Sequence, residues 1–282
     1  MTLVTTARLL ADAVERGTGL FAFNVITLEH AEGILAGAAR AEVAVVLQVS
    51  ENAVRYHEGD AAPLLRACAE LTAAHSAAAS LHLDHLSETS LLDHPELETG
   101  LGVSSVMYDA SREDYATNVA RTHEVTSRLH ERGLLVEAEL GEIGGKGGAH
   151  APGVRTDPSE AAEFVAATGV DALAVAVGSS HAMSEQTASL DHDLIGRLAD
   201  AVPVPLVLHG SSGVPRSQLR TAVADGIRKV NVGTALNVAF TDAVRGVLAA
   251  EPELVDPRRY LRPARDAVAD VVESMLRDVL GG

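Results

Sequence analysis

Several residue types are scarce in this 282-residue sequence, and each scarcity excludes a class of protein. Tryptophan is absent, aromatic side chains make up 3%, and Cys68 is the single cysteine. One cysteine cannot form a disulfide within the chain, which favours a cytoplasmic location. No apolar run approaches the roughly 20 residues that span a membrane, and residues 1–17 carry charges where a signal peptide would be apolar. We therefore expect no membrane partner.

Basic residues are also scarce, since 22 Lys and Arg stand against 39 Asp and Glu, a net charge of −17. Such a surface repels phosphate backbones, and few aromatic rings are present to stack on bases, so we expect no nucleic-acid partner. An anionic ligand would have to be held by a local site that works against the overall field. The 47% of apolar residues is ordinary for a globular chain with a large core.

Eight short β-branched runs lie along the chain, and each is followed by a helical stretch. Several are almost continuously apolar, which is typical of parallel strands covered on both faces. Eight such units in about 250 residues predict a (β/α)8 barrel, a single α/β domain over residues 1–282 with a C-terminal helical extension at about 236–282. A doubly wound sheet is the main competitor, but no GxGxxG turn follows the first strand. The predicted strands are residues 21–25, 43–50, 78–85, 105–109, 134–140, 172–178, 204–210 and 227–233, and the clearest helices are 28–40, 62–74, 118–132 and 159–168.

Nearly every predicted strand ends on a polar or ionisable residue. In a barrel the carboxyl ends of the strands meet at one mouth, where barrel enzymes carry their chemistry. Endings of this kind on successive strands predict a functional site at that mouth. The residues concerned are Asn24, Ser50, Asp84, His85, Asp109, Glu137, Glu139, Ser180, His181, His209 and Asn231.

Three histidines, His85, His181 and His209, stand at or just after the ends of strands three, six and seven. A barrel brings these ends together, and three imidazoles with an open fourth position form the pattern of catalytic zinc. The alternative is that each is a solvated or hydrogen-bonded side chain, because no two of them form a short ligand motif. Spacing alone leaves both interpretations open.

Glu137 and Glu139 have the same parity in strand five and therefore project to the same side. If that side is the barrel interior, an ionised carboxylate costs several kcal/mol unless it is paired or lies near a cation. A nearby divalent ion would compensate this cost. The alternative is a pair that faces the surrounding helices through salt bridges.

Two loops are suited to phosphate binding. Residues 209–213 (HGSSG) follow strand seven, and residues 231–234 (NVGT) follow strand eight. Small residues let backbone N–H groups approach an anion, a helix N-terminus adds partial positive charge, and barrels commonly bind phosphate after strands seven and eight. Glycine and serine also simply make turns, so each loop alone is a weak signal.

Taken together, these residues resemble the metal-dependent (class II) fructose-bisphosphate and tagatose-bisphosphate aldolases, and the resemblance covers nearly the whole chain. No single segment is specific, but their ordered set is. The matching segments are residues 21–24 (FAFN), 81–85 (LHLDH), 105–111 (SVMYDAS), 136–141 (VEAELG), 173–178 (LAVAVG), His181, 205–210 (PLVLHG), 229–234 (KVNVGT) and 256–258 (DPR).

The resemblance implies a role for each matching residue. His85, His181 and His209 would be the ligands of one zinc ion per subunit, with Glu139 as an alternate ligand beside it. Asp84 would exchange a proton with the hydroxyl at the bond that is broken or made. Asn24 and Asp109 would help to seat the substrate, and Arg258 would contact the distal phosphate near a subunit boundary. The phosphate pocket and an adjoining monovalent-cation site (Na⁺ or K⁺) would involve Gly178, Gly210, Ser212, Asn231, Gly233 and Thr234.

The implied activity is reversible cleavage of a ketose bisphosphate, such as fructose or tagatose 1,6-bisphosphate, to dihydroxyacetone phosphate and an aldehyde through a metal-stabilised enediolate. Zinc would act as the Lewis acid and Asp84 as the proton acceptor. A lysine Schiff base is disfavoured, because the sequence holds few lysines and Lys229 lies inside a strand, before its end. The resemblance also implies a homodimer or homotetramer acting in carbohydrate metabolism, as in glycolysis.

The sequence departs from the family in two loops. After strand five the family usually places an acid that protonates the enediolate carbon, whereas this chain has Lys146 and Gly147 there; Glu142 or His150 would have to replace it. Gly233 and Ala235 stand where the family is often acidic.

Two alternatives therefore stay open. One is another zinc-barrel enzyme, such as a hydrolase or deaminase, although those barrels usually begin with His-x-His where this first strand ends in Phe23-Asn24. The other is a barrel that binds a sugar phosphate with lost or altered turnover.

Overall fold

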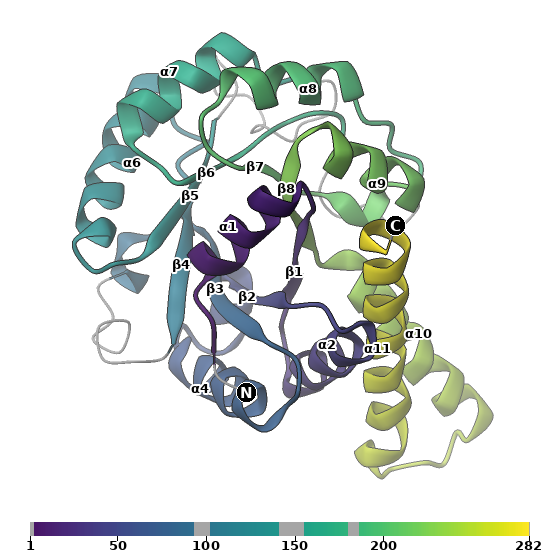
Figure 1. Ribbon diagram of the computed structural model, residues 1–282. Coiled ribbons are helices and arrows are strands. Elements are labelled where there is room, and N and C mark those ends of the chain that lie inside the picture. The colour runs from purple at the N-terminus through teal and green to yellow at the C-terminus, as the bar shows by residue number, and fades with distance from the viewer. Residues whose placement is uncertain (1–2, 93–101, 141–154, 180–185, 282) are drawn as a thin grey trace.

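The strands of the barrel form a closed parallel ring in a computed structural model, which describes residues 3–92, 102–140, 155–179 and 186–281. Eight strands pair in chain order, and β8 closes the ring by pairing with β1 (Figure 1). The prediction of a (β/α)8 barrel is confirmed. The strands are β1 (Leu20–Asn24), β2 (Val45–Ser50), β3 (Ala79–Leu86), β4 (Val103–Tyr108), β5 (Leu135–Glu139), β6 (Ala172–Ala174), β7 (Leu206–Leu208) and β8 (Ile227–Val232).

Helices surround this ring and bury its outer face (Figure 1). Nearly every strand residue is buried, as expected for a sheet covered on both sides. The α-helices are α1 (Thr6–Arg16), α2 (Leu28–Ala41), α3 (Glu51–Tyr56), α4 (Ala62–Ala74), α6 (Tyr115–His130), α7 (Pro158–Thr168), α8 (His192–Ala201), α9 (Arg216–Asp225), α10 (Thr234–Ala250) and α11 (Pro257–Leu280), and the short 3₁₀ helices are η1 (Thr89–Leu91) and η2 (Ser211–Gly213). No helix within the described residues is long and apolar enough to cross a membrane.

Helix α1 closes the end of the barrel opposite to the predicted site. The Thr6 hydroxyl lies 3.0 Å from the Ser80 hydroxyl of β3 and accepts from Ser105 of β4 at 2.7 Å. These contacts lie near the amino ends of strands, so α1 covers the base of the barrel and leaves its mouth to the loops that follow the strands.

The last two helices behave differently from each other. Helix α11 packs closely along α2, where Gly33 and Gly37 face Val268 and Val272 without room for a side chain. Helix α10 buries only Leu236 along its length, although its sequence is largely apolar. Together they form an arm that projects from one side of the barrel (Figure 1).

Two strands are much shorter than predicted, whereas the others differ by one or two residues at their ends. Strands six and seven are predicted as residues 172–178 and 204–210, but the ladders end at Ala174 and Leu208. The Val175 N–H still donates to the carbonyl of Val207 on β7, but from Ala176 onward the backbone turns to loop partners: the Ala176 N–H donates to the Thr156 hydroxyl, and the carbonyl of Val177 accepts from Asp191 N–H. The apolar run is buried as predicted, but its hydrogen bonds leave the sheet.

Candidate active site

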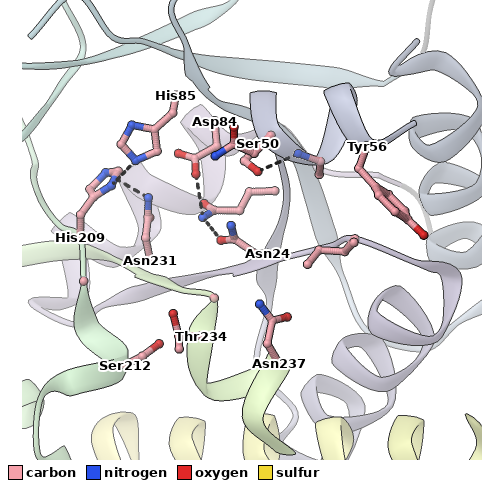
Figure 2. A pocket seen from close by; sticks show the side chains of 16 residues that line it. Asn24, Ser50, Tyr56, Asp84, His85, His209, Ser212, Asn231, Thr234 and Asn237 are labelled. Atoms are coloured by element: carbon pink, nitrogen blue, oxygen red, sulfur yellow. Dashed lines mark hydrogen bonds between the residues drawn. The ribbon is translucent and has the colours of Figure 1, made fainter. Parts of the chain in front are cut away.

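A cavity of about 450 Å³ lies at the mouth of the barrel, where the strand ends converge (Figure 2). Its size is in the range of small-molecule sites. It is lined by residues of β1, β2, β3 and β8, of the segments after β1 and β7, of α3 and of the first turn of α10. They are Asn24, Ile26, Gln48, Ser50, Asn52, Ala53, Tyr56, Asp84, His85, His209, Gly210, Ser212, Asn231, Gly233, Thr234 and Asn237.

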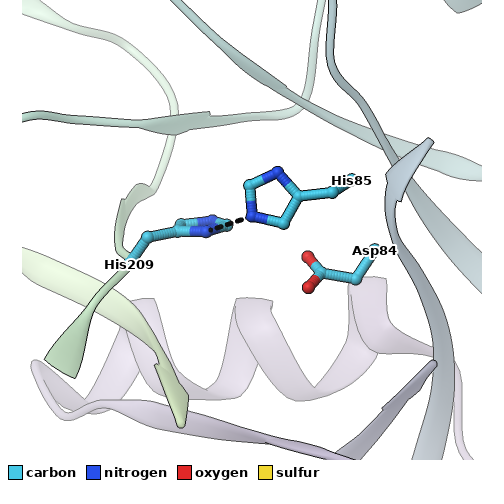
Figure 3. A group of neighbouring side chains, drawn as sticks. All are labelled: Asp84, His85 and His209. Atoms are coloured by element: carbon cyan, nitrogen blue, oxygen red, sulfur yellow. Dashed lines mark hydrogen bonds between the residues drawn. The ribbon is translucent and has the colours of Figure 1, made fainter. Parts of the chain in front are cut away.

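His85 and His209 approach each other closely at this cavity. His85 Nε2 lies 3.0 Å from His209 Nδ1, and the two rings meet edge to face with centroids 4.8 Å apart (Figure 3). The Asp84 carboxylate stands beside them, and one ligand atom from each of the three residues lies within 4.8 Å of the others. Donor atoms from β3 and from the residue that follows β7, far apart in the sequence, therefore converge as predicted.

Backbone geometry explains how Asp84 and His85 reach the same place. Neighbouring residues of a regular strand point to opposite faces. His85 has a φ of 53°, a conformation that is uncommon for a residue with a side chain, and the β3–β4 pairing shifts register between Leu83 and Leu86. This irregularity turns the His85 imidazole toward the side of Asp84.

In each imidazole, the ring nitrogen that does not face the other histidine lies against a carboxylate. His85 Nδ1 is 2.8 Å from Asp109 Oδ2, and Asp109 Oδ1 accepts from the backbone N–H (3.0 Å) and hydroxyl (2.6 Å) of Ser111. His209 Nε2 is 2.9 Å from Glu137 Oε1. If, in each ring, the nitrogen beside the carboxylate carries the proton, the lone pairs of His85 Nε2 and His209 Nδ1 face each other. A shared cation satisfies that arrangement, so these residues fit a divalent metal.

The electrostatics of the cluster also favour positive charge. Burial opposes the charged form of His85, but the carboxylates of Asp84, Asp109 and Glu139 outweigh it and raise the pKa of His85 to about 10. Burial likewise opposes ionisation of Asp84, yet the nearby imidazoles of His85, His82 and His209 hold the pKa of its carboxyl well below its usual range. Excess negative charge around two imidazoles is the environment that binds a cation.

Asp84 is held in place but keeps one oxygen available. Gln48 Nε2 donates to Asp84 Oδ2 at 3.3 Å and also to the Asn24 side-chain oxygen (Figure 2). Among the described residues, Asp84 Oδ1 has no hydrogen bond, although it is buried and lies 3.8 Å from His82 Nε2. The side-chain oxygen of Asn231 is also buried and has no hydrogen-bond partner within the same ranges. Buried polar atoms of this kind point to a ligand that completes the site.

The other end of the cavity is built from small residues and a helix start. Gly210 adopts a φ of 66°, which favours glycine, and leads into η2. The Ser212 hydroxyl accepts from the backbone N–H of Ala235 at 3.0 Å, which ties η2 to the first turn of α10. Since α10 begins at Thr234, its N-terminus lies at the cavity, where a helix favours an anion.

A second cavity of about 640 Å³ adjoins the first and shares Ser50, Asn52 and His85 with it. Asp109 and Glu139 line this second cavity, and one atom from each of His85, Asp109 and Glu139 lies within 4.8 Å of the others. Glu137 and Glu139 therefore both reach the barrel interior, which excludes the alternative of a pair facing the helices. The nearest compensating cation of Glu137 is Lys229, whose Nζ lies 2.6 Å from its Oε2.

The remaining predicted residues are distributed as follows. Asn24, Gly210, Ser212, Asn231, Gly233 and Thr234 line the first cavity. Gly178 lines neither of these cavities, and its φ of 122° and its contact with the Ser189 carbonyl leave no space for a side chain. Arg258 stands at the exposed start of α11, paired with Asp256, and does not line a cavity at the mouth. The predicted ligand His181 and the predicted loop groups Glu142 and His150 lie outside the described residues.

Several polar lining residues are not among those predicted from the sequence, namely Gln48, Asn52, Tyr56 and Asn237. Gln48 leaves a detectable signal, because it interrupts the apolar run of β2 and has the same parity as Ser50 at the strand end. Asn52, Tyr56 and Asn237 lie on helices after their strands, where polar residues are usual and give no signal.

A barrel with a histidine and carboxylate cluster at its mouth belongs to the class of (β/α)8 enzymes that place their chemistry at the ends of the strands. Residues 4–281 match the family model described as fructose-bisphosphate aldolase class-II. The chain therefore belongs to the class II fructose-bisphosphate aldolase family and is an aldehyde-lyase.

Individual relatives agree over nearly the full length. The chain is 36% identical to a fructose-bisphosphate aldolase of Giardia intestinalis, covering 96% of this chain and 91% of that protein. It is also 36% identical to a fructose-bisphosphate aldolase of Geobacillus stearothermophilus, covering 99% and 97%. The crystal structure of the YdjI aldolase from Escherichia coli K12 superposes with a TM-score of 0.84 at 28% identity, covering 99% and 97%.

Proposed function

We propose that this chain is a zinc-dependent aldolase that reversibly cleaves a ketose bisphosphate, such as fructose or tagatose 1,6-bisphosphate or a related sugar phosphate, to dihydroxyacetone phosphate and an aldehyde. The observation that carries the proposal is the pair of inward-facing imidazoles of His85 and His209 beside Asp84. In the proposal His85, His181 and His209 hold one zinc ion per subunit, and Glu139 is an alternate ligand. The family membership supports a metal-dependent lyase.

Each end of the cavity has a task in this reaction. The phosphate next to the ketone binds at the start of α10 and at η2, where Gly210, Ser212 and Thr234 let the backbone approach an anion. Binding at that end holds the sugar so that the bond to be cleaved lies beside Asp84. When bound, zinc supplies a Lewis acid that polarises the ketone and offsets the negative charge that develops on cleavage.

Asp84 is the proton acceptor in this proposal. Its carboxylate takes the proton from the hydroxyl at the bond that breaks, and returns it in the direction of synthesis. Gln48 fixes one carboxylate oxygen and leaves Oδ1 for the substrate. Asn24, held by the same Gln48, is suited to contact the sugar hydroxyls. Glu142 or His150 is proposed to protonate the carbon.

Three further proposals rest on the resemblance to the family. A sodium or potassium ion binds beside the phosphate pocket near Gly178, the protein is cytoplasmic, and residues 1–282 form one barrel domain with the α10–α11 arm as its extension. Asp109, which fixes His85, is proposed to influence substrate seating through that imidazole.

We also propose a homodimer or homotetramer. The arm supports this, because Val238 and Leu248 on α10 and Val255 after it expose apolar side chains, Val255 to 88%. Arg258, at the exposed start of α11, can contact a distal phosphate if the arm of one subunit reaches the mouth of another. Mixing Arg258→Ala with Asp84→Asn subunits tests this: hybrid assembly should restore activity above that of either parent alone, whereas no gain from stably mixed subunits would refute a shared site.

The experiment that tests the proposed reaction is a panel of phosphorylated ketoses assayed with and without a chelator, followed by metal add-back. Cleavage to dihydroxyacetone phosphate that is lost with chelator and restored by zinc is the expected result. Protein that holds zinc and binds the panel without cleavage or condensation would instead support a barrel with lost turnover. Chelator-insensitive cleavage would contradict the metal-dependent proposal.

A further inference from the structure

A buried ion pair crosses the interior of the barrel behind the histidine cluster. Lys229 Nζ on β8 lies 2.6 Å from Glu137 Oε2 on β5, and each side chain is only 1% exposed. Strands β5 and β8 are not neighbours in the barrel, so the pair spans its interior. Removing two charges from water is costly, and well-packed apolar residues of similar volume are often at least as stable. Stability alone therefore gives no reason for this pair.

The second oxygen of the same carboxylate contacts a histidine of the cluster. Glu137 Oε1 lies 2.9 Å from His209 Nε2, and both side chains are 1% exposed. Because the ammonium group of Lys229 donates to Oε2, Glu137 is an acceptor, and it takes a hydrogen bond from an N–H at Nε2. A neutral imidazole carries one N–H. The lone pair of the ring then lies on His209 Nδ1, which is the atom that faces His85.

We propose that Glu137 and Lys229 are positioning residues for the metal site: Lys229 holds the Glu137 carboxylate, which fixes the tautomer and ring orientation of His209 so that Nδ1 is presented to the metal. This inference rests on the proposed function, because it assumes a metal between the imidazoles. Carboxylate partners of metal-binding histidines act in this way in general, and their loss typically lowers metal affinity by about 10- to 100-fold.

The carboxamide of Asn231 contacts the same nitrogen. Its Nδ2 lies 3.0 Å from His209 Nε2, and an amide N–H in that place needs a lone pair on Nε2. The Glu137 carboxylate decides the tautomer, because it is buried against Lys229 and accepts at 2.9 Å. The two ends of a carboxamide have the same shape, so rotating the Asn231 amide by half a turn lets its oxygen accept from Nε2–H as well.

The two imidazoles are held differently. His85 is fixed by Asp109, which is partly exposed at the second cavity and is itself oriented by Ser111. His209 is fixed by a carboxylate that is fully buried and balanced by a lysine. Solvent and substrate can reach the first pair more readily than the second. Glu137 and Lys229 therefore hold the His209 imidazole more rigidly than Asp109 holds the His85 imidazole.

The test uses the full chain and separates orientation from stability. The double variant Glu137→Leu/Lys229→Met removes both charges and keeps similar volumes, and Glu137→Gln keeps the shape but offers an amide that can donate to Nε2 and favour the other tautomer. Metal affinity is measured by competition with a chromogenic chelator for zinc and by the visible spectrum of the cobalt-loaded protein. Thermal unfolding of the metal-free proteins is measured in parallel.

We expect the metal-free double variant to unfold at or above the temperature of the native chain, while its zinc and cobalt affinity falls about 10- to 100-fold. Glu137→Gln should also lose affinity and alter the cobalt spectrum. The matched control is Asp225→Asn, which removes the carboxylate 2.8 Å from His192 Nδ1 in a pair that lines neither cavity at the mouth; its metal affinity should equal that of the native chain.

Two outcomes are distinguishable from each other. If the native chain itself binds no metal, the proposed function fails first. If the native chain binds metal and the folded double variant binds it with equal affinity and an unchanged cobalt spectrum, this inference is overturned while the proposed function stands.

Discussion

Replacing Asp84 by asparagine should remove the proton acceptor while the fold and the cluster remain. The amide has nearly the same shape as the carboxylate, and its oxygen can still accept from Gln48, which donates to Oδ2 at 3.3 Å. The side chain is buried, so no new surface is exposed. The change is therefore confined to one charge and one proton-accepting oxygen.

Two effects set the magnitude. Loss of a general acid or base typically lowers kcat by about 10²- to 10⁴-fold, which is about 3 to 5 kcal/mol. The carboxylate also attracts a cation held by the two imidazoles, and opposite unit charges about 4 Å apart attract each other by about 4 kcal/mol at an effective dielectric constant of about 20. Weaker metal binding is therefore expected alongside the slower reaction.

The assay must separate these effects, so cleavage is measured at saturating zinc with bound metal quantified in the same sample. We predict that Asp84→Asn, fully loaded with zinc, remains at least about 100-fold slower than the native chain. Asp12→Asn, which breaks an exposed pair with Arg8 on α1, serves as the control and should leave kcat unchanged. Native activity in fully loaded Asp84→Asn would refute the role assigned to Asp84.

Three further predictions concern stability. His30 is buried and stacks on Phe240, and burial lowers the pKa of its imidazole. Because the unfolded chain binds a proton at this residue near pH 6.5 and the folded chain does not, the free energy of unfolding should fall below that pH by up to about 1.4 kcal/mol per pH unit. Denaturation curves of His30→Gln should show a smaller loss of stability with falling pH, and the same pH dependence as in the native chain would contradict this role of His30. Gly33→Ala should destabilise the fold by about 1 to 3 kcal/mol, because the new Cβ would lie 2.7 Å from the Arg265 carbonyl oxygen. Gly196→Ala is the control: a Cβ there meets open space, so the variant should be more stable than the native chain by up to about 1 kcal/mol. A Gly33→Ala variant more stable than the native chain would contradict this packing of α2 on α11. Zinc present at about 1,000 times its Kd should stabilise the metal-free protein by about 4 kcal/mol, visible as a higher Tm, and an unchanged Tm would count against a metal site.

Most strands of the barrel can be predicted from the sequence, because a strand covered on both faces needs a continuous apolar run. The runs at residues 43–50 and 227–233 match β2 and β8 to within about two residues, a usual uncertainty for strand ends. The run at 172–178 misleads, since apolar residues predict burial and not hydrogen bonding. From Ala176 onward the chain is still buried, but its backbone bonds to Thr156 and Asp191 instead of to a strand.

The site residues can be predicted where polar side chains stand at the ends of strands. They cannot be predicted where backbone conformation decides which way a side chain points. Alternation along β3 would send Asp84 and His85 to opposite faces, and only the positive φ of His85 brings them together. Parity correctly predicts that Glu137 and Glu139 share a side. Nothing local indicates that Lys229, on a strand across the barrel, is the partner of Glu137, because that contact depends on the closure of the ring.

Metal content of the purified chain, combined with X-ray absorption at the zinc edge, shows directly whether His85 and His209 hold a metal ion. We predict about one zinc ion per chain with scattering from imidazole nitrogens, and a loss of bound zinc in His85→Ala and in His209→Ala. Absence of stoichiometric metal from the native chain, or zinc binding that is unchanged when either imidazole is removed, would show that the two histidines are not a metal site.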